Sequence, residues 1–260
     1  MDRKLFIAGV ALLLLAGAAS AQKVSFKDPT GDDNGPGNYT YPTDGVYKRG
    51  SFDMTAFDVE AKGGKVNFDV TLNSALEDPW RMGGGFSTQM IFIFIDNKEG
   101  GFAETFPGLN VNFAPGDEWD RLVIISPQPS GRVKTEVEAK LSAEMAKAVV
   151  IPTRTKGAGR TLSATVDMAA LGEGDPSQWG YQVLVQSNEG FPEGKDLLTR
   201  KVNEYEGQHR FGGGTDYDCD PGTIDILAAD AQTQHDMLKY ECNPDGSAKQ
   251  MATLKMVTKQ

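Results

Sequence analysis

Short runs in which apolar and polar residues alternate recur along most of the chain and limit what it can fold into. Apolar residues occupy every second position of residues 65–72, as expected when one face of a β-strand is buried. Residues 51–59 alternate in the same way, and Gly63-Gly64 between the two runs is typical of a tight hairpin turn. The predicted strands are 24–26, 51–59, 65–72, 90–95, 121–126, 132–138, 161–166, 182–186 and 252–257.

Helical patterns are few, and only residues 141–149, 168–171 and 231–240 are predicted to be helical. Turn clusters separate the strands at the spacing expected of a two-sheet β-sandwich. We find no internal repeat, linker or composition shift that would mark a domain boundary. The sequence therefore predicts a mainly β fold, with one domain at residues 22–260.

The first 21 residues have the three parts of a secretory signal peptide. Arg3 and Lys4 give a positive start, residues 5–16 are apolar, and Ala19-Ser20-Ala21 is a small-residue cleavage site. The apolar run is shorter than the roughly 20 residues that span a bilayer, although a retained anchor is the alternative. We expect export across the inner membrane to the periplasm, cell envelope or cell surface, and a mature chain that is not an integral membrane protein.

The chain is acidic, with 36 Asp and Glu against 26 Lys and Arg and a net charge of −10. Nucleic acids and anionic lipids bind to cationic patches, and the sequence contains no such patch. Composition therefore argues against both kinds of partner.

Cys219 and Cys242 are the two cysteines of the chain. In an exported protein they are expected to form a disulfide, since thiols outside the cytoplasm tend to oxidise. Two free thiols are the alternative. A shared metal ion is less favoured, because neither cysteine has a second Cys or a His at ligand spacing.

The glycine-rich loop at residues 28–42 contains three carboxylates within six residues. Calcium prefers six to eight oxygen ligands, which carboxylates and turned-in backbone carbonyls supply. A solvated acidic turn is the alternative. The predicted calcium ligands are Asp28, Asp32 and Asp33, with Asp53 or Asp96 completing the site.

A second acidic loop, at residues 211–221, contains Asp216, Asp218 and Asp220. Their alternation matches the first three ligands of an EF-hand, but Pro221 and Leu227 stand where that motif needs Gly and Glu. An EF-hand is therefore excluded. A different calcium loop and a surface loop held by the disulfide both remain open.

A third glycine-rich loop carries Trp80 and Arg81 and leads into the apolar run 90–95. The two side chains are suited to form a flat stacking surface. A tryptophan in the protein core is the alternative.

Longer motifs follow one another through the chain. They are Asp28-Pro-x-Gly-Asp-Asp-x-Gly-Pro-Gly-x-Tyr-x-Tyr-Pro42, Gly50-x-Phe-Asp53, Asp78-Pro-Trp80, Gly85-Phe-Ser-x-Gln89, Ile95-Asp96, Pro107-Gly-x-Asn-Val111, Trp119, Gln186-Ser-x-Glu-Gly190, Phe211-Gly-Gly-Gly214, Ile224-Asp-Ile-Leu227 and Gln234-x-x-Met-Leu238. In this order they resemble the C-terminal domain of glucodextranase and its free-standing relatives, whose fold is DOMON-like and similar to family-9 carbohydrate-binding modules. The Asp-Tyr-Asp-Cys-Asp segment and its partner cysteine depart from the family pattern.

The resemblance implies a two-sheet jelly-roll-like sandwich, calcium in the loops, and binding of sugars or of the cell surface. Sugar recognition needs flat apolar faces and planar polar groups. Residues of these types are Trp80, Arg81, Tyr39, Tyr41, Gln89 and Trp119.

Nothing in the sequence indicates a self-sufficient enzyme. The chain has two histidines and lacks the nucleophile-elbow, zinc-protease and phosphate-loop motifs. A carboxylate pair for glycoside hydrolysis stays open, as does haem held by His209 and a methionine, because some DOMON relatives hold haem. We predict a non-catalytic module that binds carbohydrate or cell-surface glycan. The alternative is a structural accessory subunit of a cell-envelope or surface-layer complex.

Overall fold

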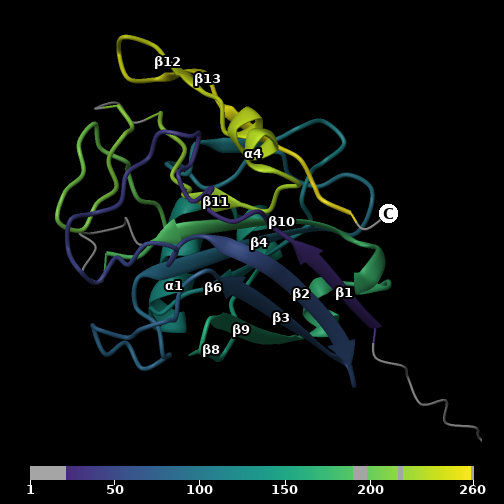
Figure 1. Cartoon of the computed structure of the whole chain (residues 1–260). Helices are drawn as coiled ribbons and strands as arrows, with labels where there is room; N and C mark the ends of the chain where they lie inside the picture. Colours follow the sequence, from purple (N-terminus) through teal and green to yellow (C-terminus); the bar gives the residue numbers. More distant parts are fainter. Residues whose placement is uncertain (1–21, 190–197, 216–218, 259–260) are drawn as a thin grey trace, which may run out of the picture.

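The computed structural model describes residues 22–189, 198–215 and 219–258, so the predicted signal peptide lies outside the described residues. The fold is mainly β with a few short helices, as the sequence predicts, and two five-stranded sheets form its body (Figure 1). No helix within the described ranges is long and apolar enough to cross a membrane.

The first sheet is antiparallel throughout, in the order β1-β2-β3-β9-β8. Its strands are β1 (Gln22–Lys27), β2 (Met54–Lys62), β3 (Lys65–Leu72), β9 (Thr161–Asp167) and β8 (Thr155–Ala158). Every second residue of β3 is buried, which confirms the face predicted from the alternation.

The second sheet has the order β11-β10-β4-β6-β7 and is antiparallel except for the pairing of β7 with β6. Its strands are β11 (Asp225–Ile226), β10 (Gly180–Ser187), β4 (Gln89–Asp96), β6 (Arg121–Ile125) and β7 (Val149–Val150). Two smaller pairs complete the β structure: β12 (Glu241–Cys242) with β13 (Ala248–Gln250), and β14 (Ala252–Leu254) with β5 (Val111–Phe113).

The helices are short and lie between the strands in sequence. They are α1 (Ser130–Lys140), α2 (Ala143–Ala148), α3 (Met168–Leu171), the 3₁₀ turn η1 (Pro176–Gln178) and α4 (Ala231–Met237). The predicted helices at 141–149, 168–171 and 231–240 correspond to α2, α3 and α4. In Figure 1, the β12–β13 hairpin extends from the body of the fold, whereas α4 packs on it through Met237.

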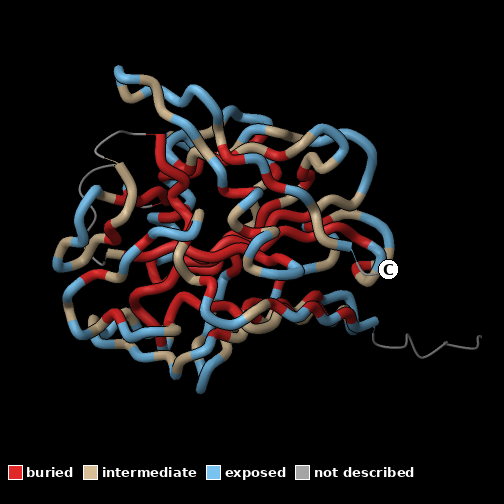
Figure 2. Tube along the Cα trace, turned by 45° about the horizontal axis from the view of Figure 1, so that its top comes forward, coloured by how far each residue is buried: buried red, intermediate tan, exposed pale blue. Residues whose placement is uncertain are grey.

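The central strand β4 has apolar neighbours on both faces and is almost completely buried (Figure 2). Of the β4 residues, Ile91, Ile93 and Ile95 lie in the core between the two sheets. The alternate β4 residues, Met90, Phe92 and Phe94, lie in a second core on the other face of the strand, to which α1, α2 and α4 also contribute. This double burial explains why residues 90–95 are an uninterrupted apolar run.

The strand predicted at residues 132–138 is wrong, because these residues belong to α1. Val133 and Val137 are the buried apolar residues of this helix. A spacing of four places them on one side of a strand and also on one side of a helix, so the pattern fits both periods. The second core decides between them, since helical packing brings both valines into it.

Candidate functional site

Three buried carboxylates converge where the ends of the two sheets meet. Asp28 follows β1, Asp32 lies four residues further on, and Asp225 begins β11. One oxygen from each lies within 4.8 Å of one from each of the others. Asp53, the residue before β2, interacts electrostatically with all three.

Backbone hydrogen bonds orient these carboxylates. The Ala228 N–H donates to Asp28 Oδ1 at 2.8 Å, and the Gly31 N–H donates to Asp53 Oδ2 at 2.9 Å. Five buried carboxylate oxygens have no hydrogen-bond partner: Asp28 Oδ2, Asp32 Oδ1 and Oδ2, Asp53 Oδ1 and Asp225 Oδ1. Because buried polar atoms are almost always paired, these oxygens form an unsatisfied cluster.

Burial, and to a smaller extent mutual repulsion, disfavours the charged form of these carboxylates. The pKa of Asp28 is raised to about 9, mainly by burial and to a smaller extent by the charges of Asp32 and Asp53. Burial likewise raises the pKa of Asp53 to about 6 and the pKa of Asp225 well above its usual value. None of the four forms an ion pair with a Lys or Arg of the described chain. A cation between them would satisfy both the charge and the open oxygens.

The structure brings together three of the predicted calcium ligands and places two elsewhere. Asp28, Asp32 and Asp53 belong to the cluster. The carboxylate of Asp33 accepts a hydrogen bond from the Tyr41 hydroxyl instead. Asp96 ends β4 beside Asp120, at the opposite end of the strand from Gln89.

The sequence reasoning missed Asp225 as a member of the cluster. It is fully buried between Ile224 and Ile226, and its Oδ2 accepts a hydrogen bond from the Met54 N–H at 2.6 Å. A single aspartate inside an apolar segment was the available signal, since a buried charge needs a partner.

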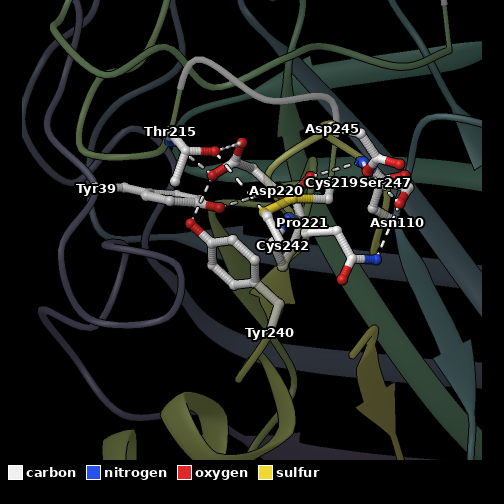
Figure 3. Close-up of a disulfide and its surroundings, with 11 residues drawn as sticks. Tyr39, Asn110, Thr215, Cys219, Asp220, Pro221, Tyr240, Cys242, Asp245 and Ser247 are labelled. Atoms are coloured by element: carbon white, nitrogen blue, oxygen red, sulfur yellow. Dashed lines mark hydrogen bonds between the residues drawn. A yellow bond between two sulfur atoms is a disulfide. The ribbon is translucent and has the colours of Figure 1, made fainter. Parts of the chain in front are cut away.

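The second acidic loop is organised around Asp220 and the disulfide (Figure 3). Asp216 and Asp218 lie outside the described residues. Asp220 Oδ1 accepts hydrogen bonds from the Thr215 N–H at 2.8 Å and the Tyr240 hydroxyl at 2.5 Å, and its Oδ2 accepts one from Thr215 Oγ1 at 2.8 Å. Both oxygens are thus engaged in holding the loop.

Cys219 and Cys242 form the predicted disulfide, with their Cα atoms 5.9 Å apart. The bond joins the acidic loop to β12, the strand after α4 (Figure 3). Tyr39 and Asn110 hold the same region, because their side chains donate to the carbonyls of Pro221 and Asp220 at 3.0 and 2.8 Å.

The Trp80 loop is fastened at its base by Asp78. This carboxylate accepts hydrogen bonds from the N–H groups of Met82 at 2.7 Å and Gly83 at 2.8 Å, and from the hydroxyl of Ser87. Partial burial raises the pKa of Asp78, but the hydrogen bonds together lower it more, so the pKa lies below its usual value. The loop is therefore braced by a charged acceptor.

A close glycine contact fixes the other end of the same loop to β8. The Gly157 N–H donates to the Gly84 carbonyl at 2.7 Å, and a Cβ atom on Gly85 would lie 2.4 Å from the Gly157 oxygen. Gly85 also has φ +82°, a conformation that other residues rarely adopt.

Trp80 and Arg81 remain accessible on this loop. Trp80 is half-buried and meets the rings of Tyr47 and His209 edge to face, with centroids 6.1 Å apart in each case. Arg81 is exposed and has φ 54°, a left-handed conformation that is uncommon for a residue with a side chain. The loop thus carries a half-buried indole and an exposed arginine at adjacent positions.

Other residues predicted to contact sugar lie inside the protein. Tyr39, Gln89 and Trp119 are buried. Gln89 Nε2 donates to the Ser51 carbonyl, and Trp119 Nε1 donates to the Glu104 carbonyl, both at 2.9 Å. The donor of each side chain, including the Tyr39 hydroxyl, finds a backbone carbonyl, which favours burial. These three are not part of an exposed surface.

If the sugar-binding residues formed one patch, Trp80 and Arg81 would meet Tyr39 or Tyr41, but among the described residues the ring contacts of Trp80 are with other side chains. Tyr41 packs instead against Phe52 and Phe211, with centroids 5.7 and 5.0 Å away. The neighbours of Trp80 are Tyr47 and His209, which the sequence reasoning did not assign to this surface.

The model of a family described as the C-terminal binding module, SLH-like, of glucodextranase matches residues 24–257. A search of curated proteins found no match.

Proposed function

Because the chain belongs to the family of C-terminal, SLH-like binding modules of glucodextranase, we propose that it is an exported, non-catalytic module that binds carbohydrate or cell-surface glycan. Residues 22–260 form one such module, stabilised by calcium. A family of binding modules, rather than of catalytic domains, supports this reading. The disulfide agrees with export to the periplasm, envelope or cell surface.

The observation that carries the proposal is the braced loop with Trp80 and Arg81. A half-buried indole presents a rigid apolar face to the C–H side of a sugar ring. The exposed guanidinium supplies planar donors for hydroxyl groups. Left-handed backbone at Arg81 costs free energy and persists because Asp78 holds the surrounding turn, as is common at binding sites.

Affinity for polysaccharide tests this proposal. Retention on insoluble polysaccharides and envelope glycans should be measured for the whole mature chain and for Trp80→Ala. We expect the substitution to remove retention. It should also lower the melting temperature moderately, because Trp80 packs against the core and Tyr47, so retention is measured at a temperature at which the variant is folded. Tyr205→Ala is the matched control, because Tyr205 is an exposed aromatic residue outside this loop. If Trp80→Ala folds and retains full binding, or if the chain binds no glycan, the proposal fails.

Calcium is supported by the unsatisfied carboxylates. The residues that would hold the ion are Asp28, Asp32, Asp53 and Asp225, and hard oxygen donors of this kind suit calcium. The ion would neutralise charges that otherwise repel one another in the interior. Its role would be to stabilise the fold, since no polar group of the Trp80 loop belongs to the cluster.

Elemental analysis and thermal unfolding test the calcium proposal separately from glycan binding. We expect about one calcium per chain at this cluster and a lower melting temperature after chelation. Ligand binding at one hundred times the dissociation constant contributes about 2.7 kcal/mol. Protein that contains no calcium and melts at the same temperature with and without chelator would contradict it.

The β12–β13 hairpin favours one alternative, a structural accessory subunit of an envelope or surface-layer complex. It extends from the body of the fold, and its residues are largely exposed (Figures 1 and 2). Exposed strand edges can pair with another chain. Recovery of envelope proteins with the wild-type chain, and their loss when the hairpin is shortened, would favour this function over glycan binding.

A further inference from the structure

A cavity of about 360 Å³ lies next to the Trp80 loop, on the side of Met82 and Gly84. Three segments form its walls: residues 82–84 of that loop, residues 126–130 after β6, and residues 151–155 before and at the start of β8. Its volume is near the lower end of the range of small-molecule sites, about 300–1,000 Å³. It is therefore large enough for a small ligand.

The charge of this cavity contrasts with that of the whole chain. The chain has a net charge of −10, yet none of the described residues that line the cavity has a carboxylate. Arg154 is the charged residue among them, and its side chain is exposed. It forms no ion pair with the described residues, so its charge is available to a ligand.

One further positive group, Arg132, is held by the wall residue Gln128. Arg132 Nη1 donates to Gln128 Oε1 at 2.9 Å, and Gln128 Nε2 donates to the buried Asn188 Oδ1 at 3.1 Å. Gln128 is itself 5% exposed, so its amide is fixed by these partners. Arg132 is not a lining residue, but this bond places its guanidinium next to a side chain of the wall.

The first turn of α1 also reaches the cavity through Pro129, Ser130 and Val133. No side chain caps this helix, and the free N–H groups of a first turn carry partial positive charge. Pro127, Pro129 and Met82 supply apolar surface on the walls. The cavity thus combines positive groups with apolar faces.

We propose that this cavity binds one acidic sugar unit of a polysaccharide, with its carboxylate near Arg154 and the first turn of α1. The inference rests on the proposed glycan binding and specifies its ligand class. Guanidinium groups match the planar geometry of a carboxylate, and the apolar walls suit the C–H face of the ring. Met82–Gly84 continue the Trp80 loop, so one glycan chain can contact both parts.

Paired oligosaccharides test the proposal with the whole mature chain. Calorimetry should compare an oligogalacturonide with the uncharged galacto-oligosaccharide of the same length and linkage. We expect the acidic ligand to bind about tenfold more tightly, and Arg154→Gln to remove that difference. Lys62→Gln is the matched control, since Lys62 is exposed and lies at the end of β2, outside the lining.

Thr153→Trp gives a second, independent variant, because Thr153 is an exposed lining residue and an indole there fills the cavity. Thr153→Trp should weaken binding of the acidic ligand. Arg154→Gln should melt at the same temperature as wild type, which shows that its effect on binding is not caused by unfolding. If both oligosaccharides bind equally and respond to Trp80→Ala alone, the cavity proposal is overturned and glycan binding stands. If neither binds, and no polysaccharide is retained, both proposals fall.

Discussion

Asp225, at the start of β11 in the second sheet, accepts a hydrogen bond from the backbone N–H of Met54, at the start of β2 in the first sheet, at 2.6 Å. This bond joins the two sheets at the end where Asp28 and Asp32 also lie. Asp225 is fully buried, and its other oxygen has no partner. One carboxylate therefore both links the sheets and adds to the unsatisfied charge.

The effect of Asp225→Asn on stability should differ between the metal-free and the calcium-loaded protein. Without calcium, loss of one buried negative charge relieves repulsion, so we expect little loss of stability or a small gain. With calcium, the variant lacks a charged ligand and should show a much smaller rise in melting temperature than wild type. A contribution of about 2.7 kcal/mol corresponds to roughly 5–10 °C for a chain of this length.

Thermal unfolding with and without calcium measures this difference. Asp33→Asn is the matched comparison in the same loop, because Asp33 is engaged with Tyr41. It should keep the full calcium response. Equal responses in wild type and Asp225→Asn would exclude Asp225 from the site.

The metal-free protein should lose stability as pH rises. The folded-state pKa of Asp28 is raised to about 9 and that of Asp53 to about 6, above the unfolded value of 3.8. Between these values the folded state binds more protons than the unfolded state, so stability is full below about pH 4 and is lost as pH approaches 9. Bound calcium should flatten this dependence, because it favours the ionised carboxylates.

Melting temperatures of metal-free protein between pH 4 and 9 check this sign. Asp28→Asn should reduce the slope, since the substituted side chain does not titrate. If the metal-free protein became more stable with rising pH over this range, the cluster would not govern the pH dependence of its stability.

Reduction of the disulfide should destabilise the chain by roughly 3 kcal/mol, because the bond closes a loop between positions 23 apart. The loop contains β11 and α4, so its loosening should also affect the cluster of Asp28, Asp32, Asp53 and Asp225. Gln234 of α4 donates a hydrogen bond to the Asp32 carbonyl. The double variant Cys219→Ser/Cys242→Ser should melt at a lower temperature than wild type and bind calcium more weakly. An unchanged melting temperature would mean that hydrogen bonds alone hold the loop.

Gly85→Ala should disturb the Trp80 loop more than Gly83→Ala does. Both positions have left-handed φ, +82° and +89°, so both substitutions cost about 1 kcal/mol in backbone strain. At Gly85 the new methyl would also lie 2.4 Å from the Gly157 oxygen, whereas nothing lies within 4 Å at Gly83. We expect a further loss of about 1–3 kcal/mol and weaker glycan binding for Gly85→Ala, and equal effects would contradict the close contact.

Periodicity predicted the strands well where one face of a strand is buried. In β3 each residue's burial follows its position, so alternation in the sequence reports it directly. The same reasoning failed for α1, because Val133 and Val137 fit either period until the second core is present. The pairing of Cys219 with Cys242 required no geometry, since the chain has no other cysteine.

The sequence by itself determined the β-rich fold, the acidic loop and the presence of an aromatic residue beside an arginine at positions 80 and 81. Only the tertiary structure decided which side chains meet. Asp225 lies 197 positions after Asp28, yet sheet packing brings their oxygens within 4.8 Å, while the nearby Asp33 points to Tyr41. Local patterns record whether a residue is buried or exposed, but convergence of distant side chains depends on how the sheets pack, and a single sequence does not encode that relationship in its spacing.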